Sequence, residues 1–481
     1  MSSAHGQSCR DFVSYRLCEW AAGLCFEDLS EEAVGAAKRF LFDSVGCALG
    51  GSQQEIARIA LDHFREMGGI GGGGSGGERG GCSVIASDFL ANPVDASFLN
   101  ALMVRAMDYN DIYWKADPVH PSDLIAGPLA LCEWCGGSGK DLLLGIVIAY
   151  EVEMRLAEFG RPGVREYGWH HATLSSFASP IAAGRMMGLS AEVMQQAVGI
   201  SGAPSMCLGA VTAGKLTNMK NAVDPMATRA GVEAAMLAAR GFSGPEHVMD
   251  GKEGFTHCFE KFGGSFDLGV LTDELPCGKG DHFKILDCGM KSFPIEALSH
   301  APLTAMMKCV SENGIGADDV AEIVVEVIAR AADILGDPAK YRPRSKETAD
   351  HSLPYSMAVG LVDGMVTPLQ FKEERIMDSA LEGVMDMVKV VANEEFEALF
   401  PEFQPSRVTV VLKDGKEFCK RVDVPKGDPR DAMTEEEIAV KFNALGSGVF
   451  GEEELARLRG VIMGMEGLGD VGEFCGCLRG G

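Results

Sequence analysis

The chain has 481 residues, 46% of them hydrophobic and 23% charged, which is typical of a soluble globular protein with room for two domains. Its formal net charge of −26 disfavours nucleic acid as a partner, because the phosphates would be repelled. No apolar run reaches the roughly 20 residues that a membrane-spanning helix needs, so we expect no membrane partner. The same net charge opposes an anionic substrate unless Lys, Arg and His side chains gather at its site.

The N-terminal segment has no secretory signal pattern, and Asp11 and Glu19 interrupt the acid-free pattern of a mitochondrial address. We therefore expect a cytoplasmic protein, with a mitochondrial location left open. The 15 cysteines are scattered, as expected of reduced thiols. Cys132 and Cys135 form a CxxC pair, but no second pair lies at zinc spacing and no larger set marks an iron–sulfur cluster. We expect neither a metal nor another cofactor.

The first predicted helix begins after Ser30, its N-cap, and ends at a Gly-Gly pair. Residues 68–81 are rich in glycine, but they do not join a strand to a helix N-terminus as a phosphate-binding loop does. We interpret them as a flexible linker or surface insertion. No G-x-G-x-x-G follows a strand pattern, which disfavours a dinucleotide-binding fold.

A helix is predicted over residues 92–106, where Asn92 is a suitable N-cap, a proline follows it and apolar residues recur at helical spacing. A polar loop containing Asp108, Asp111 and His120 comes next, before a second apolar helix. A histidine near a carboxylate between two helix ends is an arrangement that can transfer protons. The alternative is that His120 caps a helix and that the two aspartates are solvated turn residues.

Residues 139–154 are predicted as a buried helix. Small residues follow His170, which predicts close helix packing around it, whereas His171 should point elsewhere because adjacent residues of a helix are rotated apart. Ser190 is predicted to cap the next short helix.

A further helix is predicted to begin with Asp224 as its N-cap and Pro225 in its first turn, and to end at Gly241. Lys220 would lie just before the positive end of this helix. A cation there makes sense if an anion binds between the two. The alternative is a solvated surface lysine.

Near residue 287 the sequence pattern changes from helices alone to helices mixed with strands. Residues 322–329 are β-rich, and residues 407–412 and 417–424 flank an Asp-Gly turn that predicts a hairpin. Thr434 and Glu437 form a capping box that restarts helix. We predict a mainly α protein with a large all-helical domain at residues 1–286, a smaller α+β lid domain at 287–427, and C-terminal helices at 428–481 that return to the helical domain.

The stretches DYNDIYW, HPSD and KRFLFDSVGCALGG resemble the signatures of the MmgE/PrpD family, and the resemblance runs from about residue 12 to residue 450. The family comprises cofactor-free lyases that include 2-methylcitrate dehydratase and cis-aconitate decarboxylase. It implies the helical domain with an α+β lid, a homodimer and a small tricarboxylate substrate. Two stretches are closer to the dehydratases: DYND, and FPIE, which differs from the FPAH of the decarboxylases.

The resemblance also implies the site residues. His120 would transfer the proton, with Asp108 orienting it, and two lysines would clamp substrate carboxylates. The matching catalytic positions are His120, Asp108, His170 and Tyr355, and the substrate-binding positions are Lys220, Lys291, Asp111, Glu296 and His300. His300 and His351 could instead be histidines of the core or the surface.

One residue departs from the family pattern, because Ile112 stands where a threonine is common. The leading hypothesis is dehydration of a β-hydroxy tricarboxylate, most specifically 2-methylcitrate to 2-methyl-cis-aconitate. Decarboxylation of cis-aconitate to itaconate and an isomerase or epimerase reaction are alternatives. A catalytically silent carboxylate-binding relative is the hypothesis from outside the enzymes.

Overall fold

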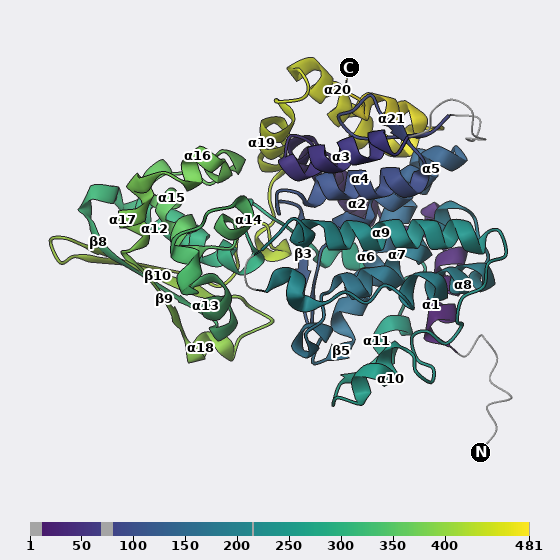
Figure 1. Ribbon diagram of the computed structural model, residues 1–481, viewed down its shortest axis with the longest axis horizontal. Helices are drawn as coiled ribbons and strands as arrows, with labels where there is room; N and C mark the ends of the chain where they lie inside the picture. The colour runs from purple at the N-terminus through teal and green to yellow at the C-terminus, as the bar shows by residue number, and fades with distance from the viewer. Residues whose placement is uncertain (1–11, 69–79, 214–215, 481) are drawn as a thin grey trace.

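The protein is described here by a computed structural model that covers residues 12–68, 80–213 and 216–480. The predicted linker lies largely outside the described residues, since residues 69–79 are not among them. Figure 1 shows a larger helical body and a smaller body of helices and strands beside it. The expected fold class, mainly α with a smaller α+β domain, is confirmed. None of the described helices combines the length and the apolar character that crossing a bilayer requires.

The larger body is built on buried helices that pack against one another, chiefly α2, α4, α6, α7 and α9. Local signals begin several of them: Ser30 accepts a hydrogen bond from the backbone N–H of Ala33, and Asn92 accepts one from Asp95. The helices of this body before residue 290 are α1 Val13–Gly23, α2 Glu31–Gly51, α3 Glu55–Glu66, α4 Pro93–Arg105, α5 Ala126–Cys135, α6 Gly139–Glu158, α7 Ala172–Met186, α8 Ala191–Gly202, α9 Met219–Ala238, α10 Phe255–Glu260 and α11 Leu268–Thr272.

The predicted start of α9 was wrong. The helix begins at Met219, so Lys220 lies in its first turn and Pro225 lies inside it instead of opening it. A proline in a helix removes one backbone hydrogen bond, and here packing against α4 and α7 on both sides compensates for that loss. The Lys220 ammonium still lies at the positive end of the helix dipole.

The smaller body contains a four-stranded sheet of order β11-β10-β8-β9, which consists of β8 Val320–Val327, β9 Val388–Ala392, β10 Ser406–Leu412 and β11 Glu417–Val422. The hairpin expected at the Asp-Gly turn is confirmed as β10–β11, and β9, which the sequence analysis did not predict, pairs parallel to β8. Helix α12 His300–Asn313 packs on β8, β10 and β11. The other helices here are α13 Ala329–Leu335, α14 Lys346–Ala349, α15 Leu353–Asp363, α16 Glu373–Ile376, α17 Glu382–Met385 and α18 Glu394–Glu397.

The C-terminal helices α19 Glu435–Gly446, α20 Glu452–Met463 and α21 Gly472–Leu478 lie beside the N-terminal ones, where yellow ribbon meets purple in Figure 1. The predicted capping box of Thr434 and Glu437 begins α19, which packs on α2. One apolar core joins residues from 13–290 and 438–478, and a second joins residues from 295–422 with Trp114. The chain therefore passes from one core to the other and back.

A small sheet lies where the two bodies meet and fixes the loop after α4. Strand β3 Asp111–Trp114 pairs with β4 Pro118–Val119 and with β7 Gly289–Met290, in the order β4-β3-β7. Asp111 faces Met290 in this pairing. The pairing of β3, which closely follows α4, with β7 thereby holds together residues about 180 positions apart in sequence.

Close packing between α2 and α4 is predicted to depend on Gly51, because a Cβ atom there would overlap the backbone carbonyl of Met103. We expect Gly51→Ala to lower the free energy of unfolding by about 1–3 kcal/mol or more, measured by urea denaturation. The control is Gly460→Ala in α20, where nothing lies within 4 Å of the added atom, and we expect that change to stabilise by about 0.5–1 kcal/mol. Equal midpoints for the two variants would contradict the packing argument.

Candidate active site

The carboxylate of Asp108 lies at the centre of a buried cluster of three cations. Lys291 Nζ lies 2.8 Å from its Oδ1, and Lys220 Nζ lies 3.0 Å from its Oδ2. Arg105 forms a short ion pair with Oδ1 from one helical turn earlier. The three cations come from the end of α4, the first turn of α9 and the segment after β7. A single carboxylate thus ties together three distant segments of the chain.

The cluster is held away from water, since Asp108, Lys220 and Lys291 are each only 2% exposed. Burial alone would raise the pKa of Asp108, but Lys220, Lys291 and Arg105 outweigh it and hold that pKa well below its usual value. Burial lowers the pKa of Lys220 to about 8, although Asp108 opposes the shift. Asp108 also has a φ of +52°, a strained conformation for a residue with a side chain. Such strain is characteristic of functional sites.

His120 is oriented by a backbone carbonyl group of the loop between α4 and α5. Its Nδ1 lies 2.6 Å from the carbonyl oxygen of Asp111, which can only accept, so Nδ1 carries the proton and Nε2 has a free electron pair. Burial, together with Arg105 and Lys291, holds the pKa of His120 well below its usual value. The neutral ring therefore has one nitrogen available as a base.

His170 has the opposite arrangement. Its Nδ1 accepts a hydrogen bond of 3.1 Å from the backbone N–H of Ala172, so in the neutral ring the proton is on Nε2. Burial and the neighbouring His171 lower the pKa of His170 well below its usual value. His170 can therefore donate a hydrogen bond to a bound group.

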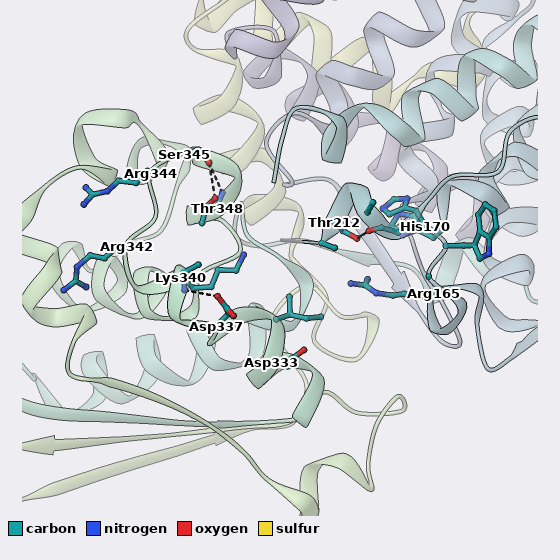
Figure 2. Close-up of a pocket in the computed structure, with 18 residues that line it drawn as sticks. Arg165, His170, Thr212, Asp333, Asp337, Lys340, Arg342, Arg344, Ser345 and Thr348 are labelled. Carbon is teal, nitrogen blue, oxygen red and sulfur yellow. Dashed lines mark hydrogen bonds between the residues drawn. The ribbon is translucent and has the colours of Figure 1, made fainter. Parts of the chain in front are cut away.

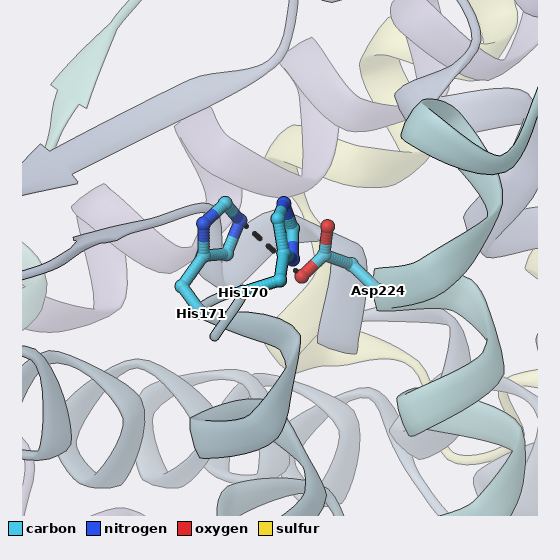
Figure 3. Close-up of side chains that lie close together, drawn as sticks. All are labelled: His170, His171 and Asp224. Atoms are coloured by element: carbon cyan, nitrogen blue, oxygen red, sulfur yellow. Dashed lines mark ion pairs between the residues drawn. The ribbon is translucent and has the colours of Figure 1, made fainter. Parts of the chain in front are cut away.

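His171 lies beside His170, with ring centres 3.8 Å apart, so the prediction that it points elsewhere was wrong. Both residues precede the first residue of α7, and the helical rotation between neighbours does not apply there. His171 Nε2 lies 3.4 Å from Asp224 Oδ1. Figure 3 marks this pair with a dashed line. Two imidazoles and this carboxylate could supply ligands for a transition metal, but Asp224 also lies 4.0 Å from Arg105 Nε. The expectation that no metal takes part stays a prediction.

Asp108, its three cations and the three histidines line an inner cavity of about 50 Å³. Glu296 is part of its wall, and burial raises the pKa of this carboxyl group. Ile112, the residue that departs from the family pattern, also lines it. The wall combines polar residues with apolar ones: Arg105, Asp108, His120, Arg165, His170, His171, Thr212, Lys220, Lys291, Glu296 and His351 with Ile112, Trp114, Pro118, Ala297 and Ile334.

Two larger cavities adjoin the inner one. The first has a volume of about 1060 Å³ and lies between the helical body and the lid, where it shares Arg165, His170 and Thr212 with the inner cavity (Figure 2). The second has a volume of about 420 Å³ and shares Trp114 and Lys291. A ligand could therefore extend from the inner cavity in either direction.

Of the nine predicted site residues, the structure brings six to the inner cavity, namely Asp108, His120, His170, Lys220, Lys291 and Glu296. The other three do not line it. The Asp111 carboxylate accepts hydrogen bonds from the backbone N–H and the hydroxyl of Ser122, so this residue acts on His120 only through its carbonyl. The Tyr355 hydroxyl donates to the backbone of Gln370 within the second core. His300 lines the second outer cavity.

Two charged residues of the site, Arg105 and Arg165, were missed, and a third residue, His351, had been left open. Arg105 stands three positions before Asp108, and this helical spacing was a usable signal. His351, which the sequence analysis left open, donates from Nδ1 to Asp350 at 2.6 Å and lines the inner cavity. Arg165 lies in a short 3₁₀ turn five residues before His170, and this nearness was the one available signal.

Comparisons with known proteins identify the family. The MmgE/PrpD N-terminal domain model matches residues 15–264, and the MmgE/PrpD C-terminal domain model matches residues 293–464. A cis-aconitate decarboxylase of Aspergillus terreus is 24% identical over 95% of this chain and 94% of its own length. The cis-aconitate decarboxylase of Mus musculus is 25% identical over 95% of the chain and 91% of its own. A 2-methylcitrate dehydratase of Salmonella typhimurium is 25% identical over 84% of each chain.

Removing the central carboxylate should destabilise the fold. We expect Asp108→Asn to lower the free energy of unfolding by about 3–5 kcal/mol, because three buried cations lose their shared partner. The control is Asp88→Asn, which breaks an exposed ion pair with Arg65 and should leave the urea midpoint nearly unchanged. A midpoint for Asp108→Asn equal to that of the control would show that the cluster does not depend on this carboxylate.

Proposed function

We propose, because this chain belongs to the MmgE/PrpD family, that it is a cofactor-independent lyase that removes water from a β-hydroxy tricarboxylate. The observation that carries the proposal is the convergence of His120, Lys220 and Lys291 on one buried cavity. These residues come from separate parts of the sequence, and a base beside two ammonium groups suits proton removal next to a carboxylate.

In the proposed reaction, His120 Nε2 takes the proton from the carbon next to a substrate carboxylate. Lys220 and Lys291 stabilise the negative charge that develops on that carboxylate, because both ammonium groups, together with Arg105, pair with a single carboxylate, that of Asp108. The carbon–oxygen bond then breaks, and Glu296 protonates the departing hydroxide to give water. A raised pKa supports this role, because the carboxyl group has to be protonated before the step.

Two features support 2-methylcitrate as the substrate. Dehydration needs both a base and an acid, and the cavity offers a free imidazole nitrogen at His120 together with the Glu296 carboxyl group. Ile112, Trp114 and Pro118 give the cavity an apolar wall, against which an alkyl substituent could pack. The product would be 2-methyl-cis-aconitate.

Decarboxylation of cis-aconitate is the second candidate. It is favoured by the coverage of the relatives, since the cis-aconitate decarboxylases match 95% of this chain and the bacterial 2-methylcitrate dehydratase matches 84%. This reaction breaks a carbon–carbon bond and needs no proton removed from carbon. The two candidates therefore differ in their products, CO2 in one case and water in the other.

We expect purified protein to convert 2-methylcitrate to an unsaturated tricarboxylate without releasing CO2, and to do so faster than it converts citrate. The assay follows the absorbance of the new double bond and the CO2 evolved from 2-methylcitrate, citrate and cis-aconitate. His120→Ala should retain its fold by circular dichroism and lose about 10²-fold or more of the turnover. Release of CO2 from cis-aconitate alone would replace dehydration with decarboxylation, and activity retained by His120→Ala would remove His120 from the mechanism.

The pH dependence should reflect Lys220. Its pKa of about 8 means that the ammonium of the free protein is lost as the pH rises through that value, so kcat/KM for a tricarboxylate should fall above about pH 8. Lys220→Arg keeps its charge at high pH and should move the fall to higher pH. Lys416→Arg, an exposed lysine of the β10–β11 turn, is the control and should leave the profile unchanged. A profile that Lys220→Arg does not shift would assign the fall to another group.

A further inference from the structure

The inner cavity is too small for the whole of the proposed substrate. Its volume of about 50 Å³ is far below the roughly 300–1,000 Å³ of typical ligand pockets, whereas the first outer cavity has about 1060 Å³. A tricarboxylate that places one carboxylate beside Lys220 and Lys291 must therefore extend into an adjoining cavity. The charged side chains of those cavities indicate which one.

The surface cations of the second outer cavity already have partners. Lys115, Lys426 and Arg430 pair with Glu402, Asp431 and Asp428 at 3.5, 3.4 and 2.8 Å. Such pairs leave little positive charge for a ligand. A third carboxylate has no obvious site on this side.

The first outer cavity differs, because two of its four Lys and Arg side chains are unpaired. Arg342 lies 2.9 Å from Asp386, and Arg344 lies 3.9 Å from Glu382. Within the part of the chain that the structure describes, Arg165 and Lys340 have no Asp or Glu oxygen within 4 Å. All four line the same cavity, but only Arg342 and Arg344 have a carboxylate partner among the described residues.

Lys340 is mostly buried, with only 8% of its surface exposed, and Arg165 is half-buried with its guanidinium 6.0 Å from the ring centre of Trp114. Burying a cation without a partner costs free energy, so an anion from solution is the expected partner. The nearby Asp337 carboxylate is engaged by the backbone N–H of Ala339. Figure 2 shows the Arg165 and Lys340 side chains extending toward one another from the helical body and from the lid.

We propose that Arg165 and Lys340 bind a terminal carboxylate of the substrate, the one farthest from Lys220 and Lys291. This inference rests on the proposed function for the identity of the substrate, and it adds two residues that select tricarboxylates over dicarboxylates. Arg165 lines both the inner and the first outer cavity, so a ligand that extends from one into the other passes its side chain. Lys340 then supplies a second positive charge from the lid, which couples the lid to the bound substrate.

The test uses ligands that bind but cannot be dehydrated. Tricarballylate has three carboxylates and no hydroxyl group, and methylsuccinate is the same molecule without one terminal carboxylate. Titration calorimetry with the full-length protein should show that Arg165→Gln and Lys340→Gln each weaken tricarballylate binding about tenfold or more. Methylsuccinate binding should change less than about twofold, because it lacks the carboxylate that these residues hold.

Arg342→Gln is the matched control, since Arg342 lines the same cavity but is already paired with Asp386, and it should leave both affinities unchanged. Lys340→Arg keeps the charge and should retain tricarballylate binding. If Lys340→Gln does not fold, Arg165→Gln decides the matter alone. Unchanged tricarballylate affinity, equal weakening of both ligands, or a wild-type protein that binds neither ligand would overturn the inference. Selective weakening in a protein that turns over no tricarboxylate would support the binding site and overturn the proposed reaction.

Discussion

The ion cluster around Asp108 is the interaction on which the rest of the site depends. Buried ammonium groups are costly, and Lys220 and Lys291 are tolerated because they share one carboxylate. Arg105, at the end of α4 and three residues before Asp108, adds a third cation. The strained backbone of Asp108 is held in place by these contacts. The cluster thus stabilises the junction of three segments and leaves positive charge facing a cavity.

The positive charge at the site is opposite in sign to the net charge of the protein. A net charge of −26 repels anions at a distance, yet the inner cavity and the adjoining cleft present Lys220, Lys291, Arg165 and Lys340. The helical body supplies the proposed base and most of the cations, whereas the lid supplies Lys340 and His351. A substrate bound across the cleft would therefore contact both bodies, and its charge would determine how strongly it joins them.

The elements that the sequence predicted well are those whose signals are local. The Asn92 cap, the capping box of Thr434 and the Asp-Gly hairpin each involve residues within a few positions of one another, and the structure has all three. The elements that it missed depend on distant partners. Strand β3 has only four residues and exists through its pairing with β4 and β7, and α9 continues through Pro225 because its neighbours hold it.

The sequence by itself determined the fold class, the family resemblance and six residues of the inner cavity, because the motifs carry those residue types at recognisable spacings. Tertiary structure alone decided which of them touch. The pairing of Asp108 with Lys220 and Lys291 joins groups more than 100 residues apart in sequence. That Arg165 and Lys340 have no carboxylate partner among the described residues likewise follows from the fold, as do the backbone contacts that place the protons on His120 and His170. Short-range patterns fix helices and turns, whereas charge pairing and burial are properties of contacts that only the folded chain creates.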